Sequence, residues 1–278
     1  MKHLNEGNIT AEATSRLAET PNVRLKEIMT ALTRHLHDFA REVRLTADEW
    51  MTGIEFLTKV GQISDDKRQE FILLSDTLGL SALVDMIAHE KGNGHATASS
   101  LLGPFYRTGA PELKTGESIA HGPGGEPLTV RGRVITGNGK PIGNAIVDVW
   151  QVAANGLYDL QDPKQGINMR GRFRSDTEGR FALRTTKPIS YSVPTDGPVG
   201  KLLKAEARDS YRPAHIHFLV SAEGYRTLTT ALYIAGDRYI EEDAVFGAKD
   251  ELAVEYIKGG AEGMDAIEFN FALAEARG

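Results

Sequence analysis

The chain of 278 residues contains no cysteine, and this absence excludes several classes of site at once. Disulfides, thiolate nucleophiles, zinc–thiolate sites and iron–sulfur clusters all require cysteine. Any metal ion that this protein binds must therefore be held by His, Tyr, Asp or Glu side chains.

Positive charge is also in deficit, because 32 Lys and Arg residues face 38 Asp and Glu residues, which gives a formal net charge of −6. A general affinity for nucleic acid is not expected of such a chain. Long apolar runs are missing, and residues 1–8 lack the apolar core of a signal sequence. We therefore expect a cytoplasmic protein with no membrane span.

The first third of the chain has the apolar periodicity of helices. Apolar residues recur at three- and four-residue steps over residues 21–44, and similar patterns cover residues 46–60 and 65–89. Thr46, followed three residues later by Glu49, has the form of a capping box at the start of the second helix. We expect three helices before residue 90.

From about residue 104 onward the chain is rich in turns and in alternating β-branched residues. Gly137–Gly139 and Asp176–Gly179 have the sequences of hairpin turns. Many short strands with turns between them predict an antiparallel β-sandwich. The expected fold is mainly β with an α-helical N-terminal part, divided into a helical region of residues 1–103 and a β-sandwich domain of residues 104–278. Strands are expected at residues 128–134, 145–152, 172–174, 180–183, 213–220, 228–234, 252–256 and 267–271.

His215 and His217 form a His-x-His pair inside a predicted strand. Residues two apart in a strand point to the same face, so both imidazoles are able to reach one metal ion. His35 and His37 have the same spacing in a helical pattern, where two positions turn the side chain by roughly 200°. We expect those two imidazoles to diverge as ordinary helix residues, whereas His215 and His217 are candidate metal ligands.

Two tyrosines lie in segments of restricted conformation. Tyr158 is in a turn just after a predicted strand, and Tyr191 is in a stretch bounded by two prolines. Two phenols and two imidazoles make a hard oxygen-and-nitrogen ligand set that suits ferric iron. Most tyrosines in such places only bury a ring and hydrogen-bond the hydroxyl, and residue type alone does not choose among eight tyrosines. Arg212, held extended by the proline after it, is either a surface charge or a cation beside the metal.

Five separate runs, in the same order, resemble the intradiol ring-cleavage dioxygenases, the catechol 1,2-dioxygenase group. The helical N-terminal part also resembles that group, where it forms a dimer interface, so the resemblance covers nearly the whole chain. The runs are LGPFY (102–106), GLYD (156–159), RGRFRSD (170–176), YSVPTDGP (191–198) and YRPAHIH (211–217).

The resemblance implies a catalytic β-sandwich with one ferric iron per subunit. Tyr158, Tyr191, His215 and His217 would be the iron ligands. Tyr191 would also act as the base that takes a proton from the substrate, and Arg212 would stabilise negative charge on the ring. The substrates would be an aromatic diol and O2. The resemblance further implies a homodimer through the N-terminal helices, and a phospholipid at that interface in some relatives.

The same resemblance implies a pocket for the aromatic ring. Asp76 is a candidate acceptor for a third hydroxyl on the substrate, and it is equally well interpreted as a helix-start cap for Leu78 onward. The implied pocket residues are Leu73, Asp76, Leu102, Gly103, Pro104, Phe105, Val193, Pro194 and Arg212.

Within the family, three runs are closest to the hydroxyquinol and chlorocatechol branch. They are FILLSDTLG (71–79), VPTDGPVG (193–200) and DAVFG (243–247). The implied reaction is cleavage of hydroxyquinol (1,2,4-trihydroxybenzene) to 3-hydroxy-cis,cis-muconate, the tautomer of maleylacetate, with catechol or chlorocatechol as alternative substrates. Ala231 lies where catechol-specific relatives tend to carry a polar side chain, which weakens the catechol assignment.

The residues alone leave three other interpretations open. A metal-free sandwich that binds other molecules would use Tyr158 and Tyr191 as core aromatics. A hydrolytic enzyme would place zinc between His215, His217 and a carboxylate. An Fe(II) extradiol-type oxygenase also needs two histidines and a carboxylate, although no His-x-Asp or His-x-Glu pairing in the sequence favours it.

Overall fold

The computed structural model describes residues 3–65, 68–89, 95–122, 124–162, 164, 166–260 and 263–276. By contacts within the chain these residues form two compact units, residues 1–59 and residues 60–278. The predicted boundary between residues 103 and 104 is a different division, and it stays a prediction.

The first unit consists of α1 (Ile9–Ser15), α2 (Val23–Glu42) and the start of α3 (Ala47–Ile63). α2 begins where the Asn22 side chain accepts a hydrogen bond from the backbone N–H of Leu25. Its apolar stripe is left largely exposed, which is typical of a surface that pairs with another surface. The exposed apolar residues of this stripe are Leu25, Ile28, Met29, Leu32, Leu36, Phe39 and Val43.

Two details of the helical prediction are confirmed. Thr46 and Glu49 form the capping box, since the Thr46 N–H donates to Glu49 Oε2 (2.9 Å) and the Glu49 N–H donates to Thr46 Oγ1 (3.3 Å). His35 and His37 both lie in α2 and diverge, because Nε2 of His35 contacts the neighbouring Arg34 whereas Nδ1 of His37 contacts a threonine hydroxyl in α1.

Residues 70–89 form two helices, and the predicted single helix over residues 65–89 is wrong. α4 (Glu70–Thr77) and α5 (Leu80–His89) meet at a bend of 75°. Gly79 lies at this bend with φ +74°, a left-handed conformation that ends a helix and that glycine adopts at little steric cost. Among the described residues, no single helix is long and apolar enough to cross a membrane, and α4 and α5 meet that requirement only as a bent pair.

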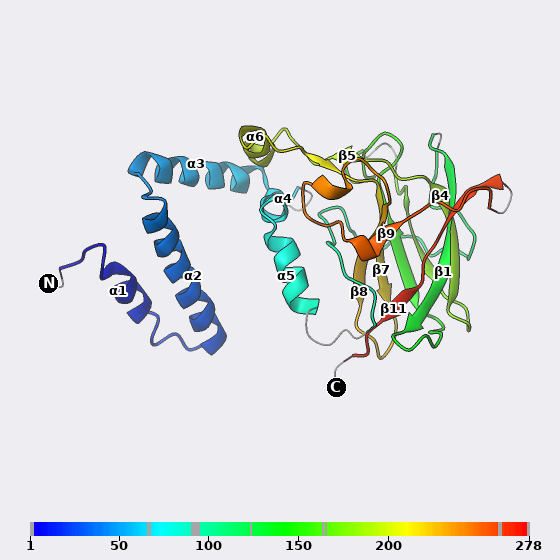
Figure 1. Ribbon diagram of the computed structural model, residues 1–278, viewed down its shortest axis with the longest axis horizontal. Coiled ribbons are helices and arrows are strands. Elements are labelled where there is room, and N and C mark those ends of the chain that lie inside the picture. The colour runs from blue at the N-terminus through cyan, green and yellow to red at the C-terminus, as the bar shows by residue number, and fades with distance from the viewer. Residues whose placement is uncertain are drawn as a thin grey trace. The chain divides into compact units, whose positions relative to one another are not determined.

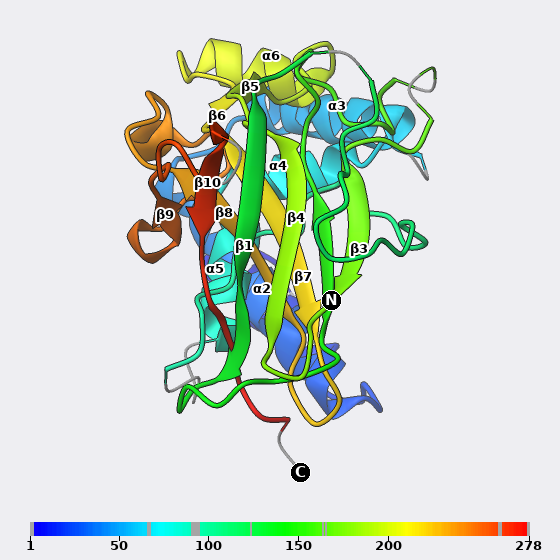
Figure 2. The ribbon, with the colours of Figure 1, turned by 90° about the vertical axis from the view of Figure 1, so that its right-hand side faces the viewer.

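Two β-sheets face each other and enclose the main hydrophobic core (Figures 1 and 2). Inward residues alternate along the strands, so that Val147 and Phe218 of one sheet meet Val130 and Leu183 of the other. The first sheet contains β1 (Pro127–Thr136), β4 (Arg180–Thr186), β10 (Asp265–Glu268) and β11 (Phe271–Leu273). The second sheet contains, in order, β3 (Arg170–Arg174), β2 (Ile146–Trp150), β7 (His215–Ser221), β8 (Leu228–Ile234) and β9 (Ala253–Val254).

The predicted sandwich is present, but its strand pairing differs from the prediction. β1 pairs with β4 antiparallel and with β10 and β11 parallel, and β8 pairs with β9 parallel. The predicted hairpin between residues 172–174 and 180–183 does not form, because β3 and β4 belong to different sheets. β1 and β2, which lie on either side of the predicted turn at Gly137–Gly139, also belong to different sheets. Alternating residues predict strands but not their partners, and here the chain changes sheet at both turns.

The predicted strand over residues 267–271 is divided into β10 and β11. At the break, the Phe269 N–H donates to the carbonyl of Arg131 (3.0 Å), and Asn270 Oδ1 accepts from the backbone N–H of Arg133 (2.9 Å). Gly132 makes this approach possible, because a Cβ at Gly132 would lie 1.7 Å from the carbonyl oxygen of Phe269. The break therefore keeps both short strands attached to β1.

Further elements gather around the start of β7. α4 and α5 cover the face of the second sheet that points away from the first (Figures 1 and 2). A small ribbon pairs β5 (Tyr191–Ser192) with β6 (Tyr211–Arg212), and α6 (Pro198–Ala205) lies between them in the sequence. The short 3-10 helices η2 (Ile240–Glu242) and η3 (Asp250–Leu252) follow β8.

Candidate active site

Four buried side chains converge from β7, from β5 and from the turn after β2. His215 and His217 project from the same face of β7, with their Nε2 atoms 3.1 Å apart. The hydroxyls of Tyr158 and Tyr191 lie 3.0 Å apart. The ring centroids are 5.6 Å apart for Tyr191 and His215, and 6.4 Å apart for Tyr158 and His217. The structure thus brings together all four residues that the sequence indicated as candidate ligands.

The two histidines present neutral rings to this site. Nδ1 of His215 lies 2.6 Å from the carbonyl oxygen of Pro213, which only accepts hydrogen bonds. Nδ1 therefore carries the proton, and the lone pair of Nε2 faces the other three residues. Burial lowers the pKa of both His215 and His217 well below the ordinary value, so both are uncharged at neutral pH. Uncharged imidazole is the form that binds a metal ion.

His217 is held by its neighbours in the second sheet. Its ring stacks on Trp150 of β2, with centroids 4.9 Å apart and an interplanar angle of 3°. On the opposite side of β7, Ala231 of β8 is the cross-strand partner of His217, and Ala231 is fully buried. Nδ1 of His217 has no hydrogen-bond partner among the described residues, and the methyl group of Ala231 cannot supply one. The sequence analysis missed Trp150, since its role depends on the strand register.

Tyr158 is enclosed on all sides. Its ring stacks on Phe105 at 4.6 Å, and its backbone N–H donates to Gln161 Oε1 (3.0 Å). Burial raises the pKa of the Tyr158 hydroxyl well above its usual value, and Tyr191 beside it acts in the same direction. A phenol in this position loses its proton only when a cation binds the oxygen.

This donor set fits ferric iron. Separations of about 3 Å are those of neighbouring donor atoms that each lie ~2.1 Å from a common metal ion. Phenolate oxygen and imidazole nitrogen are hard donors, which Fe(III) favours. In the part of the chain that the structure describes, no group of three or more His, Asp or Glu side chains is arranged to hold a metal ion. The zinc and extradiol alternatives, which need two histidines and a carboxylate, lack their ligand set there.

Arg212 lies directly opposite Tyr191 in the β5–β6 ribbon and reaches the histidines. Its Nη1 is 3.1 Å from Nε2 of His215, and its Nε and Nη2 donate to the two carboxylate oxygens of Asp243 at 3.0 and 3.2 Å. Burial alone acts to lower the pKa of Arg212, but Asp243 holds that pKa well above its usual value. The guanidinium is therefore a buried, permanently positive group beside the four candidate ligands.

Asp243 is a site residue that the sequence analysis missed. Besides Arg212, its carboxylate accepts hydrogen bonds from three backbone N–H groups of the loop that follows it. Nothing in the sequence connects Asp243 with an arginine 31 positions earlier, because the loop after η2 brings them together only in the fold.

A second buried ion pair lies directly behind Tyr158. Arg170 donates from Nε and Nη2 to the carboxylate of Asp159 at 2.8 and 2.5 Å, and from Nη2 to the carbonyl of Phe105 at 3.1 Å. Arg107 donates to the same carboxylate at 2.6 Å. The pair therefore fixes both the residue next to Tyr158 and the backbone of the aromatic ring that stacks on it.

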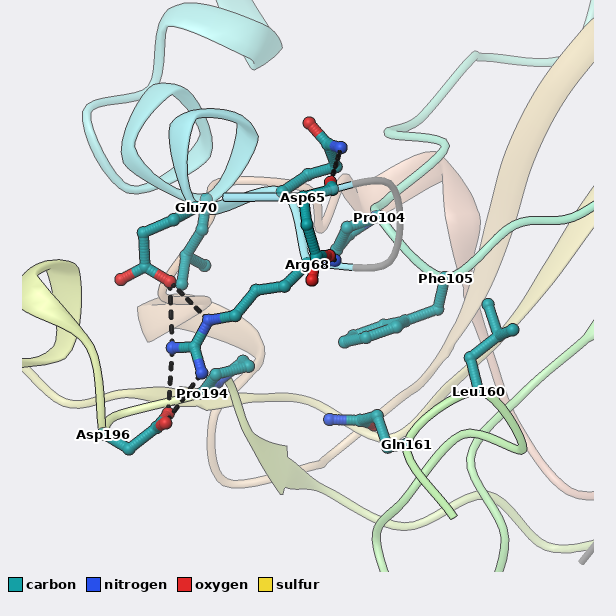
Figure 3. Close-up of a pocket in the computed structure, with 11 residues that line it drawn as sticks. Asp65, Arg68, Glu70, Pro104, Phe105, Leu160, Gln161, Pro194 and Asp196 are labelled. Atoms are coloured by element: carbon teal, nitrogen blue, oxygen red, sulfur yellow. Dashed lines mark hydrogen bonds and ion pairs between the residues drawn. The ribbon is translucent and has the colours of Figure 1, made fainter. Parts of the chain in front are cut away.

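A cavity of about 280 Å³ lies beside Phe105 (Figure 3). Four of the nine residues predicted for the ring pocket line it, namely Leu73, Pro104, Phe105 and Pro194. Its other lining residues were missed by the sequence analysis and are mostly polar. They are Asp65, Arg68, Gln69, Glu70, Leu160, Gln161 and Asp196.

The other five predicted pocket residues lie elsewhere around the site. Gly103 is next to the ring of His217, since a Cβ at Gly103 would lie 3.8 Å from its Cε1. Val193 is buried after β5, Leu102 is 40% exposed, and Arg212 is described above. Asp76 is buried in the last turn of α4.

The placement of Asp76 bears on its two interpretations. Asp76 lies in the last turn of α4, and α5 begins at Leu80, so Asp76 does not directly precede a helix. Contact with substrate stays a proposal. Burial raises the pKa of Asp76, while Ser81 and the positive charge of Arg212 act to lower it. A buried carboxyl group within the field of Arg212 remains a candidate for contact with substrate.

Comparison with known proteins agrees with this geometry. The family model described as "Dioxygenase" matches residues 101–275, and the model described as "Catechol dioxygenase N terminus" matches residues 22–96. The chain belongs to the intradiol ring-cleavage dioxygenase family. The predicted family, enzyme class and sandwich fold are thereby confirmed, and non-haem iron is the cofactor that membership implies.

Similar relatives include hydroxyquinol-cleaving enzymes. The chain is 47% identical to 6-chlorohydroxyquinol 1,2-dioxygenase of Cupriavidus pinatubonensis over 276 aligned residues. The alignment covers 98% of this chain and 99% of the relative. The solved structure of hydroxyquinol 1,2-dioxygenase from Pseudomonas putida DLL-E4 has a TM-score of 0.91 at 45% identity, covering 98% and 99% of the two chains. Catechol 1,2-dioxygenase from Pseudomonas arvilla C-1 has a TM-score of 0.84 at 30% identity, covering 98% and 93%.

Proposed function

We propose that this dioxygenase uses O2 and one ferric iron per subunit to cleave hydroxyquinol between its two adjacent hydroxylated carbons. The product is 3-hydroxy-cis,cis-muconate, the tautomer of maleylacetate. The observation that carries the proposal is the convergence of Tyr158, Tyr191, His215 and His217, with separations of 3.0 and 3.1 Å. Phe105, which stacks on Tyr158, also lines a cavity of about 280 Å³. The greater identity to enzymes named for hydroxyquinol than to those named for catechol supports this substrate.

The two tyrosines are proposed to have different roles. Bound iron supplies the redox and Lewis-acid chemistry that lets a diol react with O2, and the four convergent residues hold it. Tyr158 remains a ligand, because its ring is enclosed by Phe105 and its backbone is fixed by Gln161. Tyr191 lies on a strand of only two residues, and its hydroxyl is near enough to the donor set to accept a proton from a substrate hydroxyl there.

Arg212 is proposed to stabilise negative charge that develops on the ring. Its guanidinium is buried, positive and fixed in direction by Asp243 before substrate arrives. A preorganised charge in a site without water stabilises a transition state more than a mobile charge does. The one-to-one pairing with Tyr191 in the ribbon keeps this charge next to the proposed base.

Asp76 is proposed to accept a hydrogen bond from the third hydroxyl of hydroxyquinol. It is on α4, the helix that also contributes Leu73 to the cavity wall, and it lies within the field of Arg212. Catechol lacks this hydroxyl, so the contact would favour hydroxyquinol. Leu102, Gly103, Pro104, Phe105, Val193 and Pro194 complete the proposed ring pocket.

Turnover in ¹⁸O2 tests the proposed function. The iron-loaded protein is expected to consume one O2 per hydroxyquinol and to place both labelled atoms in the ring-opened acid. Hydroxyquinol should have a higher kcat/KM than catechol or 4-chlorocatechol. A preparation of verified iron content that takes up no O2 with any of the three diols would contradict the proposal, and faster catechol turnover would assign the alternative substrate.

We also propose a homodimer formed through the N-terminal helices, with a phospholipid at the interface. The exposed apolar stripe of α2 supports it, because such a stripe gains stability when a second copy or acyl chains cover it. Light scattering should give twice the chain mass of 30.3 kDa. Phosphorus analysis of an organic extract tests the lipid. A cytoplasmic location stays a prediction that cell fractionation tests.

A further inference from the structure

The cavity beside Phe105 is lined by two chemically different sets of side chains (Figure 3). One set is apolar and consists of Leu73, Pro104, Phe105, Leu160 and Pro194, of which Phe105 stacks on the candidate ligand Tyr158. The other set is charged and consists of Asp65, Arg68, Glu70 and Asp196. None of these four has a part in the proposed chemistry.

Arg68 is held between two carboxylates (Figure 3). It donates from Nε and Nη2 to Glu70 Oε2 at 3.1 and 3.0 Å, and from Nη1 and Nη2 to the two oxygens of Asp196 at 2.7 and 2.9 Å. The hydrogen bonds to Asp196 raise the pKa of Arg68, and Arg68 in turn lowers the pKa of Asp196. Both groups are charged at neutral pH, and four donated bonds commit the guanidinium to these carboxylates.

Glu70 anchors this arrangement to the fold. It is only 1% exposed, and its Oε1 accepts from the backbone N–H of Val199 at the start of α6 (3.1 Å). A Cβ at Gly197 would lie 2.2 Å from Glu70 Oε1 and 2.6 Å from Arg68 Nη2, so only glycine allows the approach. The charges of Arg68, Glu70 and Asp196 are therefore fixed in place by packing and hydrogen bonds.

One positive and three negative side chains give this charged set a formal net charge of −2. We propose that these four residues, Asp65, Arg68, Glu70 and Asp196, form a charged rim that admits an uncharged diol and disfavours the dicarboxylate that the reaction makes. The inference rests on the proposed function, in which two hydroxylated carbons become two carboxylates. Phenolic hydroxyls with pKa values near ~10 are uncharged at neutral pH, whereas the product is a dianion that the rim repels.

The rim has a specific task because a buried cation, Arg212, lies beside the candidate ligands. The buried guanidinium of Arg212 attracts the dianion that forms beside it. Without an opposing charge, the product would compete with the next substrate molecule. The rim therefore limits product inhibition, and it selects between substrate and product by charge and not by shape.

The test is the inhibition constant of cis,cis-muconate against hydroxyquinol turnover by the iron-loaded enzyme at low ionic strength. Asp196 is 69% exposed, so its variants are expected to fold. Asp196→Asn should lower the inhibition constant by roughly three- to tenfold, the effect of one screened unit charge a few ångströms away. Asp196→Arg should lower it further, and added salt should reduce both differences. Arg68→Lys keeps the charge and should stay near the wild-type value.

Two controls separate charge from loosened packing. Phenol, an uncharged competitor, should bind all variants alike. Glu112→Gln removes one charge from an exposed ion pair with Arg174 (3.2 Å) and should leave the muconate constant unchanged. An unchanged muconate inhibition constant in both Asp196 variants would overturn the proposed rim. An equal change in the inhibition constants of phenol and muconate would also overturn it. Wild-type protein that turns over no diol would count against the proposed function, and direct calorimetric binding of muconate would then still decide on the rim.

Discussion

Tyr191 and Arg212 are direct cross-strand partners, each on a strand of two residues. The ribbon that they form places a candidate base beside a buried positive charge. Because the two residues are paired in the ribbon, the position of one depends on how firmly the other is held.

Arg212→Lys should reduce kcat by about 10²- to 10³-fold, with a smaller change in KM. Lysine keeps the charge but loses the planar fork that donates to both oxygens of Asp243. Steady-state kinetics with hydroxyquinol measures the effect. Arg174→Lys, in an exposed pair, is the matched control and should retain wild-type rates. A kcat within twofold of wild type would remove Arg212 from the proposed role.

Tyr158→Phe and Tyr191→Phe should differ from each other. Tyr158→Phe is expected to lose iron or its visible colour, because it removes the enclosed ligand. Tyr191→Phe should retain more iron but slow the deprotonation of substrate, measured by stopped-flow mixing without O2. Tyr225→Phe, at the edge of the main core, is the control. Full iron and colour in Tyr158→Phe, or unchanged mixing kinetics in Tyr191→Phe, would count against the respective role.

Asp76→Asn should stabilise the protein at neutral pH and weaken its preference for hydroxyquinol. Burial raises the pKa of Asp76 above 3.8, so the folded state binds more protons than the unfolded state. Stability then falls as pH rises through the interval between 3.8 and the raised pKa, and asparagine avoids this loss. Urea unfolding should show that the variant has a higher free energy of unfolding than wild type at pH 7, and that this difference shrinks towards pH 4.

The same variant tests substrate choice. Loss of a charged acceptor should reduce the ratio of kcat/KM for hydroxyquinol to that for catechol by roughly 10- to 100-fold. Asp250→Asn, on the exposed side of η3, controls for the loss of one negative charge. A constant ratio would show that Asp76 does not contact the third hydroxyl.

Gly132→Ala should destabilise the sandwich by about 3 kcal/mol, because the new methyl group would lie 1.7 Å from the carbonyl oxygen of Phe269. Thermal unfolding measures the loss. Gly139→Ala has no atom within 4 Å of the new methyl and differs only in its positive φ, so about 1 kcal/mol is expected. Equal effects of the two substitutions would contradict the close packing at Gly132.

Local patterns predicted the features that local geometry determines. The two-residue period of a strand placed His215 and His217 on one face, and the capping box of Thr46 and Glu49 involves four consecutive residues. The bend at Gly79 was missed because the apolar pattern continues through it. The turns at Gly137–Gly139 and Asp176–Gly179 form, but the strand pairings predicted across them were wrong, because the residues of a strand do not determine its partner.

The candidate site likewise contains residues that the sequence identified and residues that only the fold brings together. Family resemblance pointed to Tyr158, Tyr191 and Arg212, which spacing alone did not select. Asp243 and Trp150 contact Arg212 and His217 only through the tertiary fold. The ion pair between Arg68 and Asp196 joins residues 128 positions apart, and no periodicity carries such information.

The central claim is that two tyrosines and two histidines bind ferric iron and that the substrate reaches it directly. The visible spectrum of aerobically purified protein tests this claim before and after hydroxyquinol is added without O2. The account predicts a broad red-brown charge-transfer band that shifts when hydroxyquinol is added. No such band in a preparation with full iron content would contradict the two-tyrosine site and the roles assigned to Tyr158 and Tyr191.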